Sequence, residues 1–348
     1  MNDYIAKAMA HNGQIRVFAA VTTETVEKAR ILHNMNPTPT VALGRVLTGA
    51  ALMSQTLKAI NQTITIQIKG DGPIGGIVAV TDYQAGVRGY VHNPNFDVPL
   101  NDKGKFDIKT AVGSGYLNVI KDLGLKEPYI GSVDLVSGEI AEDLTYYYAF
   151  SEQTPTAMNL GVLIGAEGKV LAAGGFFIQL MPDAGEEAIE KVEKGISRIE
   201  SITAVIHQGK TPENIIRLLF PDGDLEVFDP VPVSYKCYCS RERMQRNLMA
   251  LGRKDLEEIA GDETGAELVC HFCNKKYHTD FTKPVTLIFV DRLLYNLFEI
   301  VPRSCPLDFD STFLTTMFVF ASCAYSGCIF MMSERCMARK STVARRLL

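Results

Sequence analysis

The sequence predicts an α+β protein with an N-terminal sheet-plus-helix domain, a helical linker layer and a small C-terminal zinc-binding domain. Three observations support this prediction. Strand and helix signals alternate over residues 1–182, isoleucines recur at helical spacing in an acidic segment at 183–232, and two short cysteine pairs lie within 233–283. An apolar tail, residues 284–348, fits none of these parts.

The N-terminal domain is expected to contain a sizeable sheet. Gln62–Lys69 alternates strictly, with isoleucines on one face, as a half-buried strand does. Thr40–Lys58 carries a broad apolar stripe at helical spacing. The other predicted elements are a helix at Thr25–Asn34, a strand at Gln14–Val21, a hairpin of Gly76–Tyr83 and Gly86–His92, strands at Ser132–Leu135, Thr145–Phe150 and Val162–Ile164, and an apolar run at Val170–Leu180.

Composition narrows the classes of protein that need to be considered. The chain has 348 residues, enough for two or three domains, and a net charge of −5 argues against a protein built wholly to coat nucleic acid. The N-terminus, with Asp3 and no apolar run, does not resemble a secretory signal. We therefore expect a cytoplasmic protein, in which the eight cysteines stay reduced and serve as metal ligands or redox groups.

No nucleotide or catalytic site is predicted. Gly70–Gly75 matches G-x-G-x-x-G, but a strand rather than a helix is expected to follow, so we interpret it as a strand-to-strand turn. The sequence has no Walker loop, and no Ser-His-Asp or paired-carboxylate site can be argued from it. We expect a protein that is not an enzyme, works without ATP and has no small-molecule substrate.

The segment 183–232 is predicted to be a helical layer. Its isoleucine stripe runs to a helix end near Gly209, and a second helix is expected to begin with Thr211 as N-cap and Pro212 at the first position. Two interpretations stay open. The layer is either a helical hairpin packed permanently on the sheet, or one that detaches, since Gly185 and Gly195 weaken the helix by up to ~1 kcal/mol each.

The cysteine pairs predict a metal site that oxidants can dismantle. Cys237 and Cys239 form C-x-C, and Cys270 and Cys273 form C-x-x-C, so four thiolates can surround one zinc ion per chain. The segment between them is expected to be helical at Arg241–Ala250 and Lys254–Ala260. His271 and His278 lie near the metal in sequence, but with four cysteines available we expect them outside the ligand set. Disulfide sulfurs are poor zinc ligands, so oxidation should expel the metal and unfold the small domain that depends on it.

Several segments resemble one known family. They are HFCNKKY around the second cysteine pair, GDGPIGGIVA (70–79), SGEIAEDLTYYYAFSEQTP (137–155) and AAGGFFIQLMP (172–182). Over residues 3–280 the chain resembles the redox-regulated 33 kDa chaperonin family of heat-shock proteins. The resemblance implies an ATP-independent holdase that binds unfolding client proteins under oxidative stress. It also implies that oxidation forms the disulfides Cys237–Cys239 and Cys270–Cys273, releases zinc and produces an active homodimer.

Two other functions are compatible with a cysteine-rich region. A zinc-ribbon nucleic-acid-binding protein would use Arg241, Arg243 and Arg246, but the charge of this region is nearly balanced, and nucleic acid is not expected as a partner. A thiol oxidoreductase would use Cys270 and Cys273. However, the C-x-x-C is followed by NKKYHTD, a poor match to the helix that such enzymes place there.

The tail lies beyond the part that resembles the family. Residues 311–333 contain no Asp, Glu, Lys or Arg and are long enough to span a bilayer. Three interpretations stay open: a non-native tail produced by a fusion, frameshift or gene-model error, a membrane anchor, and a soluble extension. A single span would put the basic C-terminus opposite the cytosolic body, against the positive-inside rule, which favours the first. We expect the core and the zinc domain not to require the tail.

Overall fold

The computed structural model describes residues 2–102, 104–221, 224–249 and 266–279. Five strands form the antiparallel sheet A, in the order β10-β1-β2-β9-β8. They are β1 (Tyr4–Ala10), β2 (Ile15–Val21), β8 (Thr156–Ile164), β9 (Val170–Leu180) and β10 (Leu225–Pro232).

Sheet B has six strands in the order β11-β5-β4-β3-β6-β7, and all its pairs are antiparallel except β11 with β5. Its strands are β3 (Thr63–Gly70), β4 (Ile77–Asp82), β5 (Gly86–Val91), β6 (Gly115–Asp122), β7 (Tyr129–Asp134) and β11 (Ser234–Tyr235). A separate hairpin pairs β12 (Ala266–Val269) with β13 (Lys276–Thr279). Strand β4 follows the Gly70–Gly75 loop, as expected for a strand-to-strand turn.

The helices of the core are α1 (Thr23–His33), α2 (Pro37–Ser54), α3 (Ile108–Val112) and α4 (Ala141–Phe150). Helix α2 contacts strands of both sheets and is buried along nearly its whole length. This explains its sequence, since a helix that is apolar on every side needs neighbours on every side. The larger hydrophobic core surrounds α2, between the two sheets.

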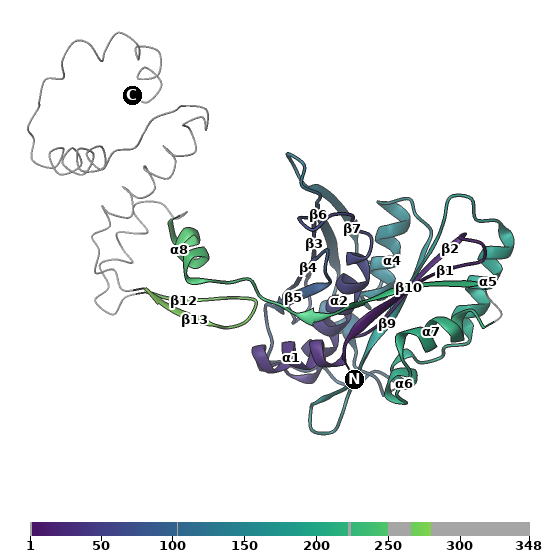
Figure 1. Cartoon of the computed structure of the whole chain (residues 1–348). Coiled ribbons are helices and arrows are strands. Elements are labelled where there is room, and N and C mark those ends of the chain that lie inside the picture. The colour runs from purple at the N-terminus through teal and green to yellow at the C-terminus, as the bar shows by residue number, and fades with distance from the viewer. Residues whose placement is uncertain (1, 103, 222–223, 250–265, 280–348) are drawn as a thin grey trace, which may run out of the picture. The chain divides into compact units, whose positions relative to one another are not determined.

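Three further helices cover the other face of sheet A (Figure 1). They are α5 (Glu186–Ser197), α6 (Ile202–His207) and α7 (Pro212–Leu219). Successive residues of β9 alternate between the two cores: Phe177 packs with the α2 cluster, and Phe176 packs beneath α5–α7. Because both faces of the sheet are covered, β9 is apolar along its length up to Gln179 rather than alternating.

The expected packing of the helical segment on the sheet is confirmed, with one correction. The predicted long helix to Gly209 is two helices, because Ser201 starts a new one by accepting a hydrogen bond from the Ala204 N–H at 3.3 Å. Thr211 and Pro212 begin α7 as predicted. The same segment ends in the strand β10, which pairs with β1 at the edge of sheet A.

The predicted strand at Thr145–Phe150 is wrong, since these residues form the second half of α4. Their aromatic and β-branched side chains favour a strand, but tertiary packing overrides that preference. Tyr147 and Tyr148 are buried in the α2 core, and Tyr146 stacks on Phe150 one helical turn away, with ring centroids 5.6 Å apart. Four strands of the two sheets, β1, β6, β10 and β11, were not predicted.

Within the described ranges, no helix combines the length and apolar character needed to cross a bilayer. The predicted helix Lys254–Ala260 and the tail at 284–348 lie outside the described residues.

Candidate metal centre

The first cysteine pair follows a strand that is anchored to the core. Strand β11 pairs with β5, and the Lys236 N–H donates to the Val87 carbonyl at 2.8 Å. Cys237 and Cys239 come directly afterwards. Helix α8 (Arg241–Met249) then begins, with the Ser240 hydroxyl accepting from the Arg243 N–H at 3.2 Å. The predicted helix Arg241–Ala250 is confirmed over Arg241–Met249, and its arginines at 241, 243 and 246 are exposed.

The second pair lies in the turn between β12 and β13. The Cys270 carbonyl accepts from the N–H groups of Cys273, at 3.3 Å, and Asn274, at 2.8 Å, and the Cys270 N–H donates to the Lys275 carbonyl at 3.0 Å. Asn274 has a φ of 55°, a left-handed conformation that asparagine tolerates better than most residues. This tight turn holds the two thiols close together.

The structure brings all four predicted cysteines together. Their sulfur atoms lie within 4.8 Å of one another. Cys237 Sγ is 3.7 Å from Cys270 Sγ, and Cys239 Sγ is 3.4 Å from Cys273 Sγ. A tetrahedral ion with metal–sulfur distances of about 2.3 Å would separate its sulfurs by roughly 3.8 Å. The cluster therefore has the donor set and spacing of a four-thiolate metal site.

Comparison with known proteins identifies the family. The family model described as Hsp33 protein matches residues 3–280. The chain belongs to the Hsp33 family. Its curated relatives include the 33 kDa chaperonin of Acetivibrio thermocellus, 56% identical over 277 residues that cover 80% of this chain and 94% of the relative. The 33 kDa chaperonin of Ruminiclostridium cellulolyticum is 55% identical over 278 residues, covering 80% and 95%.

A solved structure has the same fold. The crystal structure of the 33 kDa chaperonin (heat shock protein 33 homolog) from Thermotoga maritima has a TM-score of 0.77 and 38% identity. The match covers 84% of this chain and 99% of that one. This Hsp33-family chain is a redox-regulated chaperone with an α+β fold. The comparisons give no support to a zinc-ribbon nucleic-acid binder.

His271 and His278 of this Hsp33-family chain lie outside the four-cysteine cluster. The His271 ring packs against Tyr90, with centroids 5.6 Å apart, and His278 Nε2 lies 3.7 Å from the Glu267 carboxylate. Among the described residues, the cluster of potential metal ligands is made of the four cysteines alone.

The thiols differ in acidity when no metal is bound. Burial raises the pKa of the Cys237 and Cys273 thiols. Burial acts in the same direction on Cys239, but hydrogen bonds, first among them that of the Tyr277 hydroxyl at 3.0 Å, outweigh it and lower the pKa of Cys239 to about 7. The first negative charge of the metal-free cluster therefore lies at Cys239, and Tyr277 stabilises it.

We expect Tyr277→Phe to raise the pKa of Cys239 in the reduced, metal-free protein toward the ~8.5 of an unperturbed cysteine. A lowered pKa stabilises the folded state above the unfolded pKa, and that stabilisation is lost as the pH falls through about 7. In the Tyr277→Phe variant, this stabilisation of the folded state should be lost at a higher pH. Iodoacetamide labelling from pH 6 to 9, with peptides mapped by mass spectrometry, measures the shift. An unchanged titration of Cys239 would contradict the role of Tyr277.

Tyr235 connects the metal centre to the core, and nothing in its sequence context singled it out. Its hydroxyl lies 2.8 Å from the Gly89 carbonyl, hydrogen-bonds to the Phe272 carbonyl within the C-x-x-C, and lies 3.2 Å from His33 Nε2. Burial raises the pKa of Tyr235, so the hydroxyl stays protonated. Asn274 adds a bond from its side-chain amide to the Leu32 carbonyl at 2.8 Å. The cysteine turn is thus hydrogen-bonded to α1 directly and to β5 through Tyr235.

Proposed function

We propose that Cys237, Cys239, Cys270 and Cys273 bind one zinc ion per chain and that their oxidation activates the chaperone. The observation that carries this proposal is the four-sulfur cluster, whose spacing fits a tetrahedral ion. Zinc would hold all four sulfurs as thiolates, the form that reacts with peroxide. Cys237, Cys239 and Cys273 are partly exposed, so the cluster is accessible from solvent.

The proposed oxidation forms the disulfides Cys237–Cys239 and Cys270–Cys273. Each disulfide forms with loss of two electrons from a pair of thiolates, and one hydrogen peroxide takes up those electrons and two protons to become two waters. Once both pairs are oxidised, the cluster offers no thiolate to a metal. The nearest sulfur contacts run across the pairs, from Cys237 to Cys270 and from Cys239 to Cys273, so the pairing has to be mapped on digested protein. Cross-linked Cys237–Cys270 peptides would contradict it.

Chain continuity supports a route from the cysteines to the helical layer. The order along the chain is α7, β10, β11 and then Cys237, so loss of order at the cysteines frees one end of β11 and β10. Strand β10 is a largely exposed edge strand. The α5–α7 layer covers an apolar face of sheet A that includes Ile15, Val17 and Phe176. We propose that this layer detaches after oxidation and that the uncovered apolar surfaces bind unfolded client proteins.

We further propose a cytoplasmic protein that forms a homodimer when oxidised, hydrolyses no ATP, turns over no small-molecule substrate and does not use nucleic acid as a partner. The reducing cytosol would keep the cysteines ready for oxidation. Apolar surfaces uncovered on two chains would favour their association.

Peroxide treatment is expected to release one zinc per chain and, without ATP, to convert a weak suppressor of client aggregation into a strong one. A chromogenic chelator follows the metal, while light scattering of a chemically unfolded client follows aggregation. Reduction with dithiothreitol in the presence of zinc should reverse both signals. Release of zinc with unchanged client aggregation would show that the cysteine cluster does not control chaperone activity.

A further inference from the structure

A polar cavity of about 370 Å³ lies in the N-terminal domain, and none of the four cysteines lines it. It is lined by Arg16 of β2, Lys121 of β6, Tyr148 of α4 and Gln179 of β9, together with Lys58 and Glu152. Its volume lies within the ~300–1,000 Å³ range of small-molecule sites. We propose that this cavity binds a small oxyanion, a phosphate or a carboxylate, through Arg16 and Tyr148.

Arg16 brings a positive charge that no described residue neutralises. One terminal nitrogen donates to the Gln179 side-chain oxygen, an uncharged acceptor, and the guanidinium lies 5.6 Å from the centroid of the Phe18 ring. The Nε–H is buried and has no hydrogen-bond partner among the described residues. Burial lowers the pKa of Arg16, as expected for a partly desolvated cation without a counter-ion. An oxyanion would accept from the Nε–H and neutralise the charge.

Tyr148 supplies a second unused donor. Its side chain is 2% exposed, and its hydroxyl forms no well-aligned hydrogen bond with a described residue, the nearby Thr56 hydroxyl included. The Thr56 hydroxyl, which also lines the cavity, donates instead to the Met53 carbonyl at 2.8 Å. Burial raises the pKa of Tyr148, so its hydroxyl stays protonated and able to donate. A buried hydroxyl without a partner is costly, and a bound acceptor would remove that cost.

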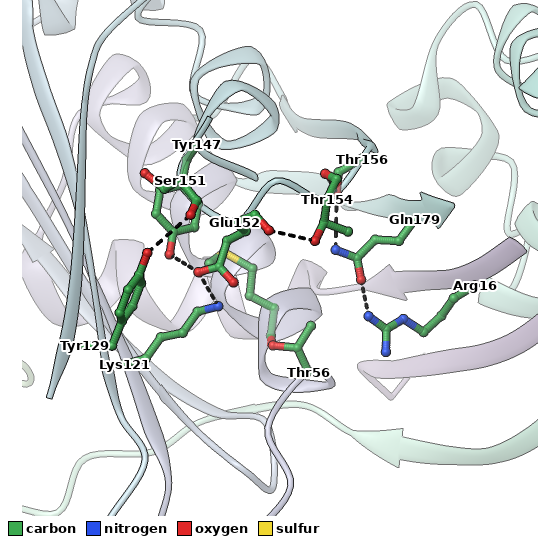
Figure 2. Close-up of polar contacts among 11 residues, drawn as sticks. Arg16, Thr56, Lys121, Tyr129, Tyr147, Ser151, Glu152, Thr154, Thr156 and Gln179 are labelled. Carbon is green, nitrogen blue, oxygen red and sulfur yellow. Dashed lines mark hydrogen bonds and ion pairs between the residues drawn. The ribbon is translucent and has the colours of Figure 1, made fainter. Parts of the chain in front are cut away.

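The remaining charges of the cavity also favour an anion. Glu152, its one lining carboxylate, pairs with Lys121 at 2.7 Å and accepts from the Tyr147 hydroxyl at 2.5 Å. Figure 2 shows Glu152, Lys121 and Tyr147 on one side, and the hydrogen-bonded side chains of Arg16, Gln179 and Thr156 on the other. Three lining cations, Arg16, Lys58 and Lys121, against one anion leave a net charge of +2.

Isothermal titration of the full-length, reduced, zinc-loaded protein tests the proposal with two probes, inorganic phosphate and succinate. Sodium chloride at matched ionic strength is the reference. Saturable one-site binding of either probe supports the oxyanion site, and comparing the two affinities decides between phosphate and carboxylate. If neither probe binds beyond the chloride reference, the proposal is overturned.

Variants locate the binding. Arg16→Gln should weaken the affinity by roughly tenfold or more, and Tyr148→Phe by roughly tenfold. Arg45→Gln is the matched control: Arg45 also has a buried Nε–H without a described partner, but Glu139 neutralises it at 2.5 Å, and it lines another cavity. That variant should bind as the wild type does. Equal affinity of the wild type, Arg16→Gln and Tyr148→Phe would overturn the assignment.

Tyr148→Phe also gives a measurement that does not depend on how Arg16→Gln folds. Without ligand, its urea midpoint should be unchanged or higher, because the variant removes a buried hydroxyl that has no partner. With saturating phosphate, it should gain less stability than the wild type. A lower midpoint without ligand, together with undiminished stabilisation by phosphate, would show that the hydroxyl is used elsewhere and does not bind the anion.

Discussion

Replacing Cys270 by serine is expected to reduce bound zinc from about one ion per chain to nearly none. Cys270 is the buried member of the cluster, and it contacts Cys237 across the two pairs. A serine hydroxyl stays protonated at neutral pH and cannot replace a thiolate ligand. Structural zinc contributes roughly 10–16 kcal/mol to the folding of small zinc modules, so we expect the loss to disorder the β12–β13 hairpin as well.

Elemental analysis after dialysis against a weak chelator measures the zinc, and amide hydrogen exchange of residues 266–279 reports on the hairpin. Cys323→Ser is the matched control, because it makes the same substitution outside the two cysteine pairs. That variant should keep its zinc and its exchange protection. A Cys270→Ser protein that still held one zinc per chain would disprove the proposed ligand set.

Replacing Asp143 by alanine is expected to destabilise the core by about 4 kcal/mol. The carboxylate is fully buried and accepts four backbone hydrogen bonds at the start of α4. The donors are the N–H groups of Val136 (2.8 Å), Ser137 (3.0 Å), Gly138 (3.3 Å) and Ile140 (2.9 Å). Each buried donor left without an acceptor costs about 1–3 kcal/mol, and these costs are not fully additive.

The chain has no tryptophan, so far-ultraviolet circular dichroism should follow urea unfolding. A chelator removes the contribution of the metal centre. Asp107→Ala is the control, since Asp107 is a partly exposed N-cap of α3 that accepts from the Thr110 N–H at 2.9 Å. Its loss should cost about 1 kcal/mol. Equal midpoints for the two variants would rule out a special role for the buried carboxylate.

Patterns that repeat over a few residues could be predicted from the sequence. The alternating isoleucines of β3, the apolar run of α2 and the Thr211–Pro212 start of α7 all appear in the structure. The four cysteines belong to the same class, because pairs separated by one or two residues lie close together in almost any backbone conformation. Spacing within each pair therefore identified the four cysteines, and the tertiary structure brings the two pairs together.

Structural features that depend on contacts between distant segments of the chain could not be predicted from the sequence. Residues 145–150 have strand-like side chains, yet they are helical because Asp143 organises the preceding turn and the α2 core accepts Tyr147 and Tyr148. Strand β10 exists only because it pairs with β1, more than 200 residues earlier in the chain.

The residues around the cysteine cluster and around the polar cavity also come together only through contacts between distant segments. No sequence pattern marks the residues that surround the two sites. They are Tyr277 beside Cys239, Tyr235 between β5 and the cysteine turn, and Arg16, which faces an apolar core without a counter-ion. Periodicity and short spacing are properties of the chain itself, and they predicted α1, α2, most strands of the two sheets and the four cysteines that the structure brings together. Hydrogen-bond partners, burial and unpaired charge arise only when distant segments pack together, so the tertiary structure alone decided them.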